Sequence, residues 1–215
     1  MATIPSSYVD LAQLGIKVAE NWANLYPNYT ANFTTAADLL VFHQDFLTSV
    51  TKSKEQDGIK QEDTTSLKTI NETIDSSLAQ LKISIKFAHR VTNSSFFSAY
   101  GIAKKNNAYI FPRDNDGRNQ ALTMLINKLR EPNNIVAQQP EGLQFWADLA
   151  AAHAQAWRKT STTTAVKSSF VGTNEEMFEQ SSELLRKLRR QIQIDFPKKQ
   201  VSSVIRSFGF LEESF

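Results

Sequence analysis

Residues 67–85 read LKTINETIDSSLAQLKISI and hold the clearest structural pattern in the chain. Apolar side chains recur there at every third or fourth position: Leu67, Ile70, Ile74, Leu78, Leu81 and Ile85. In an α-helix this spacing brings them onto one face over about five turns, and the intervening positions are mostly polar. The stretch therefore predicts an amphipathic helix that buries one face against other helices.

Working outward from this stretch, the same kind of spacing recurs on both sides of it. The further expected helices cover residues 8–26, 35–50, 119–130, 140–156 and 174–194, and short helices are expected at 96–100 and 201–208. Gly101 and Gly209 follow the two short helices, where a helix commonly ends in a left-handed residue that glycine adopts without steric cost. The charged residues 51–63 and the Thr-rich residues 160–167 lack apolar spacing and are interpreted as polar loops. Residues 102–111 are expected to form a small β-hairpin.

Three short matches occur in the same order in the two halves of the chain, at offsets of about 105 to 110 residues. They pair residues 27–28 with 132–133, 37–43 with 147–153, and 94–102 with 202–210. We interpret them as an internal duplication of a three-helix repeat, the first copy in residues 1–112 and the second in residues 113–215. The expected fold is all-α, a six-helix bundle whose two tandem repeats are related by a pseudo-twofold axis, around one core or as two bundles.

Composition and charge narrow the class of protein. Apolar residues make up 41% and charged residues 21%, as in folded globular proteins, and the absence of cysteine excludes disulfides and thiolate chemistry. The first residues lack the pattern of a secretory signal, and no apolar run is long enough for a bilayer. A soluble, cytoplasmic protein without a membrane partner is expected. Residues 1–110 carry 10 basic and 10 acidic side chains and residues 111–215 carry 14 and 12, so neither half is predicted to be a charged binding arm.

Two histidines recur with an aspartate five positions earlier, as Asp38/His43 and Asp148/His153. Five residues turn a helix by about 500°, so the two side chains of each pair point about 140° apart and cannot share a metal ion or form a dyad within one helix. His43 and His153 are therefore interpreted mainly as packed residues at a core edge. Alternatively, they line a small-molecule or active-site pocket where the repeats meet. Trp157, beside a basic residue, is a candidate for an interface.

The densest basic cluster lies in residues 186–206 and includes Arg186, Arg189 and Arg190. Such a cluster can bind nucleic acid or another anionic surface. The same helix begins with glutamates, and Glu183 precedes Lys187 by one turn, an order that suits the helix dipole. A solvated helix face is the simpler interpretation.

These patterns predict no catalytic residue, no metal ligand and no cofactor. We therefore expect a non-enzymatic helical protein that binds another macromolecule, a protein or a second copy of itself. Nucleic-acid or anionic-surface binding through residues 186–206 is one alternative. A small-molecule binder or enzyme with a pocket between the repeats is the other.

Overall fold

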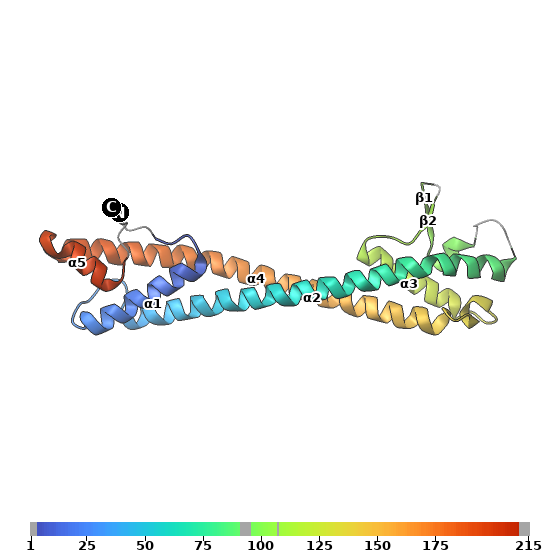
Figure 1. Ribbon diagram of the computed structural model, residues 1–215, viewed down its shortest axis with the longest axis horizontal. Helices are drawn as coiled ribbons and strands as arrows, with labels where there is room; N and C mark the ends of the chain where they lie inside the picture. Colours follow the sequence, from blue (N-terminus) through green and yellow to red (C-terminus); the bar gives the residue numbers. More distant parts are fainter. Residues whose placement is uncertain (1–3, 91–95, 107, 211–215) are drawn as a thin grey trace. The chain divides into compact units, whose positions relative to one another are not determined.

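The structure, a computed structural model, describes residues 4–90, 96–106 and 108–210, and the described chain is mostly helical (Figure 1). In chain order its elements are α1 (Tyr8–Leu25), α2 (Ala36–His89), the 3-10 helix η1 (Phe97–Tyr100), β1 (Ala103–Lys105), β2 (Ala108–Ile110), α3 (Asn115–Leu129), the 3-10 helix η2 (Ile135–Gln138), α4 (Leu143–Asp195) and α5 (Lys198–Phe208). The expected hairpin is confirmed, with β1 antiparallel to β2 and Ala103 opposite Ile110.

The expected six-helix arrangement needs a correction, because the described residues form five α-helices and two of these are very long. α2 has 54 residues and runs through the segment 51–63, and α4 has 53 residues and runs through the segment 160–167. Both segments were expected to be loops. Residues 51–63 are rich in Lys, Glu and Gln, which favour helix without requiring burial. Their missing apolar period reflects a polar contact between helices: Asp57 pairs with Lys167, and Asp63 pairs with Lys159 at 2.7 Å.

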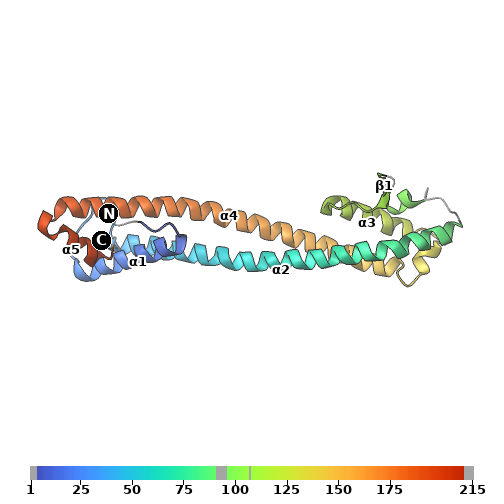
Figure 2. The same ribbon diagram turned by 45° about the horizontal axis from the view of Figure 1, so that its top comes forward.

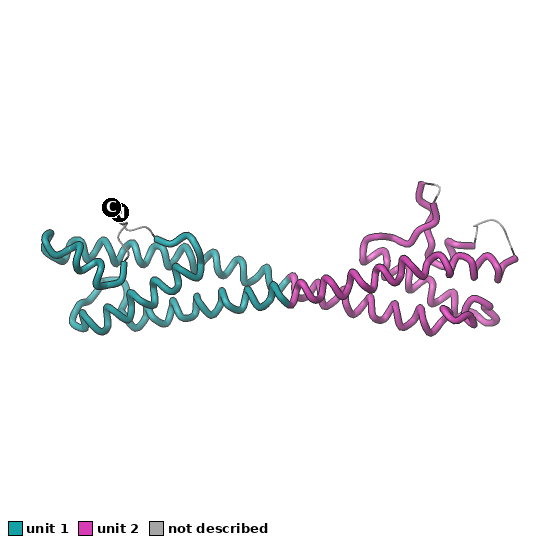
Figure 3. Tube along the Cα trace, viewed as in Figure 1, with its two compact units in different colours: residues 1–58, 165–215 teal, residues 59–164 magenta. Residues whose placement is uncertain are grey.

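The chain divides into two compact units (Figure 3). Unit 1 comprises residues 1–58 and 165–215, and unit 2 comprises residues 59–164. This division differs from that of the expected repeats, residues 1–112 and 113–215, because each long helix contributes its two parts to different cores.

Unit 1 is built from α1, the first part of α2, the last part of α4, and α5, which contacts α1 (Figure 2). Its core is a cluster of buried apolar side chains from all four helices, among them Leu11, Val18, Phe46, Leu188 and Phe208. α2 and α4 run antiparallel here. His43 bonds to Ser181, and Ser49, later on α2, bonds to Asn174, which comes earlier on α4.

Unit 2 is built from the last part of α2, η1, the hairpin, α3, η2 and the first part of α4. The apolar face expected for residues 67–85 is confirmed, since Ile74, Leu81 and Ile85 are buried in the core of this unit. Gly101 closes η1 in the left-handed region at φ 75°, and a Cβ there would lie 2.3 Å from the carbonyl oxygen of Ala121. Gly209 closes α5 in the same way at φ 101°, so both expected helix-ending glycines are confirmed.

Candidate functional site

His43 is fully buried in unit 1, and both of its ring nitrogens are hydrogen-bonded. Nδ1 lies 2.8 Å from the carbonyl oxygen of Leu39, which can only accept, so Nδ1 carries the proton. Nε2 lies 2.8 Å from the Ser181 hydroxyl and accepts from it. Burial lowers the pKa of His43, opposed by the Leu39 hydrogen bond. The ring is therefore a neutral link between α2 and α4, with no free nitrogen for a ligand.

His153 is also fully buried, but in unit 2, where Nδ1 lies 2.7 Å from Oδ1 of Asn119 on α3. No group in the described part of the chain bonds to its Nε2. Burial lowers the pKa of His153, and the positive charge of Arg118 adds to this effect. Each histidine thus makes its hydrogen bonds inside its own compact unit, and their pairing in one pocket stays a prediction.

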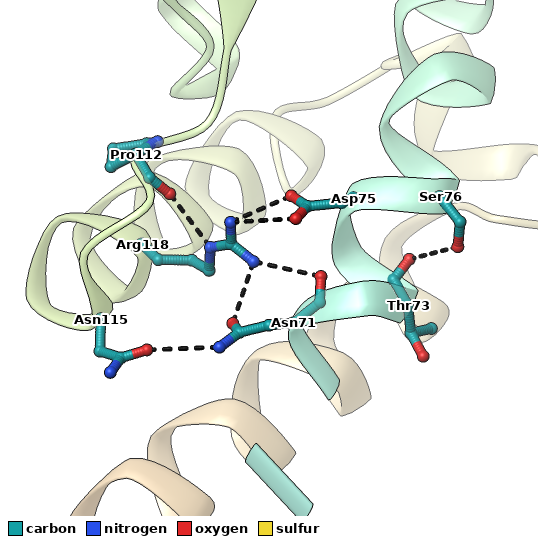
Figure 4. Close-up of polar contacts among 7 residues, drawn as sticks. All are labelled: Asn71, Thr73, Asp75, Ser76, Pro112, Asn115 and Arg118. Carbon is teal, nitrogen blue, oxygen red and sulfur yellow. Dashed lines mark hydrogen bonds and ion pairs between the residues drawn. The ribbon is translucent and has the colours of Figure 1, made fainter. Parts of the chain in front are cut away.

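Arg118 gathers the polar contacts near the start of α3, as Figure 4 shows. Its side chain is 3% exposed. Nε donates to the carbonyl oxygen of Pro112 at 3.0 Å, and one terminal nitrogen donates to the backbone and side-chain oxygens of Asn71 at 3.1 and 3.0 Å. The other terminal nitrogen donates to both carboxylate oxygens of Asp75, at 3.0 and 3.3 Å. This guanidinium ties α3 to α2 and is a structural group rather than a ligand site.

Trp157 is half-buried on α4, and its indole N–H donates to Asp116 on α3 at 3.0 Å. It lines a groove of about 270 Å³ together with Asn119, Leu122 and Arg158. This hydrogen bond makes the Trp157 side chain part of the contact between α3 and α4. Its role as an interface residue stays a prediction.

The basic residues of the last part of α4 lie on unit 1. Arg186 and Arg190 are exposed, whereas Arg189 is half-buried. Lys187 pairs with Glu183 at 2.6 Å, and this contact lowers the pKa of the Glu183 carboxyl. This is the pair expected from the sequence, with the acidic residue one turn before the basic one, as suits the helix dipole. Arg186 and Arg190 leave positive charge at the surface.

A second basic surface lies on unit 2, and the sequence reasoning missed it. The 38 residues from Ser76 to Arg113 contain six Lys and Arg and no Asp or Glu. Five of these cations are exposed: Lys86, Arg90, Lys104, Lys105 and Arg113. We call this set the basic end of unit 2. A count by halves conceals it, because every acidic residue of residues 1–110 lies before Ser76.

Ring contacts connect the α2 part of the basic end to the hairpin part. The Lys86 ammonium lies 6.0 Å from the centre of the Phe97 ring, and Phe97 packs edge-on against Tyr109 at 5.0 Å between ring centres. Tyr109 pairs with Lys104 across the hairpin, and such partners project from the same face. Lys86 and Lys104 therefore border one aromatic cluster.

Exposed apolar side chains lie among these cations. On the last turns of α2, Ile83 is 59% exposed and Phe87 is 73% exposed, one turn apart on the same face. Phe96 is 38% exposed, and its ring stacks on that of His89 with 4.1 Å between centres and planes 8° apart. Burial, followed by the neighbouring Lys86 charge, lowers the pKa of Lys82. The end of α2 thus combines crowded positive charge with exposed apolar surface.

No protein-family model, curated protein or solved structure matches this chain. Among residues 4–90, 96–106 and 108–210, no group of three or more His, Asp or Glu side chains is placed to hold a metal ion. None of the helices in those ranges has the length and apolar character needed to cross a lipid bilayer.

Proposed function

We propose that the protein is a non-catalytic helical protein that binds another macromolecule, and that it does so through the basic end of unit 2. The observation that carries this proposal is the exposed Phe87 beside the exposed cations Lys86 and Arg90. An apolar side chain of this size is normally buried, and one surrounded by positive charge suits a partner that offers both apolar contact and negative charge.

The charge balance of the compact units supports an anionic partner. By sequence, unit 2 carries 13 Lys and Arg against 9 Asp and Glu, an excess of four positive charges. Unit 1 carries 11 against 13, an excess of two negative charges. The small net charge of the whole chain therefore combines two units of opposite sign, and long-range attraction of a polyanion would act on unit 2.

A matched pair of charge-reversal variants tests this surface. We expect Lys86→Glu with Arg90→Glu to lower the salt concentration that elutes the protein from immobilised heparin, a polyanion. Lys52→Glu with Lys54→Glu, two exposed positions on the unit 1 part of α2, changes the net charge equally and should leave elution nearly unchanged. Equal elution of the two variants would refute the assignment to unit 2. Circular dichroism checks that both remain folded.

We also propose that the chain arose by duplication. A short helix, a long helix and a short helix ending in a left-handed glycine occur in this order as α1, α2, η1 and, with η2 inserted between the first two, again as α3, α4, α5. The two long helices differ in length by one residue, 54 against 53, and each carries one of the two paired histidines, both fully buried.

This repetition supports a second candidate surface, the basic helix region 186–206. Ile194, near the end of α4, is 81% exposed and follows the exposed Arg190 by one turn, much as Ile83 lies among cations on α2. Here the neighbouring Asp195 reduces the positive charge. Arg186→Glu with Arg190→Glu, measured on the same heparin column, tests it. If this variant lowers the eluting salt concentration more than the Lys86 and Arg90 variant does, the region 186–206 becomes the first candidate surface and the basic end of unit 2 the second.

A further inference from the structure

We infer that the macromolecule bound at the basic end of unit 2 is a single-stranded nucleic acid, with its phosphates on Lys86, Arg90 and Lys104 and a base stacked on Phe87. This inference rests on the proposed function and names the chemical class of the partner. Its support comes from how the cations are distributed and from which apolar side chains they surround.

The cations are spread over two elements instead of converging on one point. Lys86 lies in the last turn of α2 and Arg90 directly follows the helix, whereas Lys104 and Lys105 belong to β1, and the Phe97 and Tyr109 rings lie between Lys86 and Lys104. A single small anion is held by donors that converge on it. A row of exposed cations along an aromatic cluster instead suits an extended chain of charges, such as a nucleic-acid backbone.

The carboxylates on neighbouring elements, those of Glu131 and Asp114, cancel only a small part of this positive charge. Glu131, two residues after the end of α3, acts electrostatically on Tyr100, but its carboxylate is paired with Lys128. Asp114 accepts the backbone N–H of Gly117 as the N-cap of α3. It also borders the hairpin cavity of about 550 Å³ and there offsets part of the charge of Lys105 and Arg113, two cations to which no phosphate is assigned.

The exposed rings favour bases over an acidic peptide or a lipid surface. Phe87 is 73% exposed, and Arg90 follows it by three positions, directly after the end of α2. A second ring, that of Phe96, is 38% exposed and stacks on His89, which lies about 200° around the axis of α2 from Phe87. Bases stack on such rings irrespective of sequence, and cations beside the ring bind the adjoining phosphates. In a duplex each base is already stacked on both sides, so an exposed ring engages a single strand.

The test uses the full chain and a fluorescently labelled oligothymidylate of about 20 nucleotides, a length that covers a typical single-strand site. Fluorescence anisotropy measures affinity at two salt concentrations, with a duplex of equal length for comparison. We expect the single strand to bind more tightly than the duplex, and its affinity to fall as salt rises. Phe87→Ala and Phe87→Leu should each weaken binding roughly ten-fold, the size of a lost base stack.

The control is Phe33→Ala, because Phe33 is a partly exposed phenylalanine on unit 1, at 38%, and its removal should leave the affinity unchanged. Wild-type affinity in Phe87→Leu would show that apolar contact suffices without stacking, and would overturn the inference. Equal affinity for single strand and duplex would also overturn it.

Two further measurements separate this inference from the proposed function. Polyglutamate and vesicles containing phosphatidylglycerol are titrated with wild type and Phe87→Ala. If either binds in a Phe87-dependent way and the oligonucleotide does not, the nucleic-acid inference is wrong while the proposed function stands. If the Lys86 and Arg90 variant also elutes from heparin like its control, both fail.

Discussion

Gly15 on α1 lies directly against the buried ring of His43. A Cβ built on Gly15 would lie 1.9 Å from Cδ2 and 2.1 Å from Nε2 of that ring, far inside van der Waals contact. The ring cannot swing away without breaking its bonds to Leu39 and Ser181. Gly15→Ala should therefore destabilise the protein, although alanine is the better helix former.

The magnitude follows from three opposing contributions. Forcing a methyl group into a packed core costs about 1–3 kcal/mol, and separating a buried hydrogen-bonded pair costs about 1–3 kcal/mol more. Replacing glycine inside a helix returns about 1 kcal/mol. We expect a net loss of about 3 kcal/mol in the free energy of unfolding.

Urea unfolding followed by circular dichroism measures this loss. Gly58→Ala and Gly172→Ala are matched controls inside α2 and α4, because nothing lies within 4 Å of a Cβ at either position. Both should stabilise the protein by about 0.5–1 kcal/mol. The double variant Gly15→Ala, His43→Ala should lose much less unfolding free energy than the two single variants lose together, because without the His43 ring the new methyl group has nothing to clash with. A Gly15→Ala protein as stable as the wild type would refute the packing argument.

Three further predictions concern buried polar groups. The pKa values of His43 and His153 are lowered in the folded state, so the unfolded chain binds protons first as pH falls below about 6.5. The free energy of unfolding should then fall between pH 7 and 5, by up to about 1.4 kcal/mol per pH unit for each histidine, and His43→Gln should reduce this slope in urea titrations. Arg118→Lys should cost about 3 kcal/mol in the same assay, because lysine cannot reproduce the planar fork of donors; wild-type stability would contradict Figure 4. Asp63→Ala should cost about 1–3 kcal/mol by leaving Thr163 without its acceptor, whereas Asp63→Leu with Thr163→Val should be neutral or stabilising in thermal melts.

The helical class, the buried face of residues 67–85, the hairpin and the glycine-ended short helices could all be predicted from sequence. Each depends on neighbours in the chain. The predicted loop at residues 51–63 was wrong because an apolar period reports burial against a core, not helicity. Asp57 and Asp63 face cations and hydroxyls on α4, so the helix continues without that period.

The contacts of the candidate site depended on information that the sequence does not display. His43 meets Ser181, which lies 138 positions away, only because α2 and α4 pair antiparallel in one particular register. The basic end of unit 2 was visible as a run without acidic residues, but a count over whole halves averaged it with the acidic residues before it. Phe87 was missed because an exposed aromatic side chain has no local signature.

The division of the chain into units sets an order for folding during synthesis. Unit 2 is one uninterrupted stretch, residues 59–164, so every part of its core has been synthesised before the last part of α4 is made. α1 and the first part of α2 are made earlier still, but their partners Leu188 and Phe208 are made last. The apolar faces of α1 and the first part of α2 therefore stay exposed while unit 2 folds. A ribosome-arrested chain in which a flexible C-terminal linker carries residue 164 beyond the exit tunnel should show a protected unit 2 beside a protease-sensitive α1.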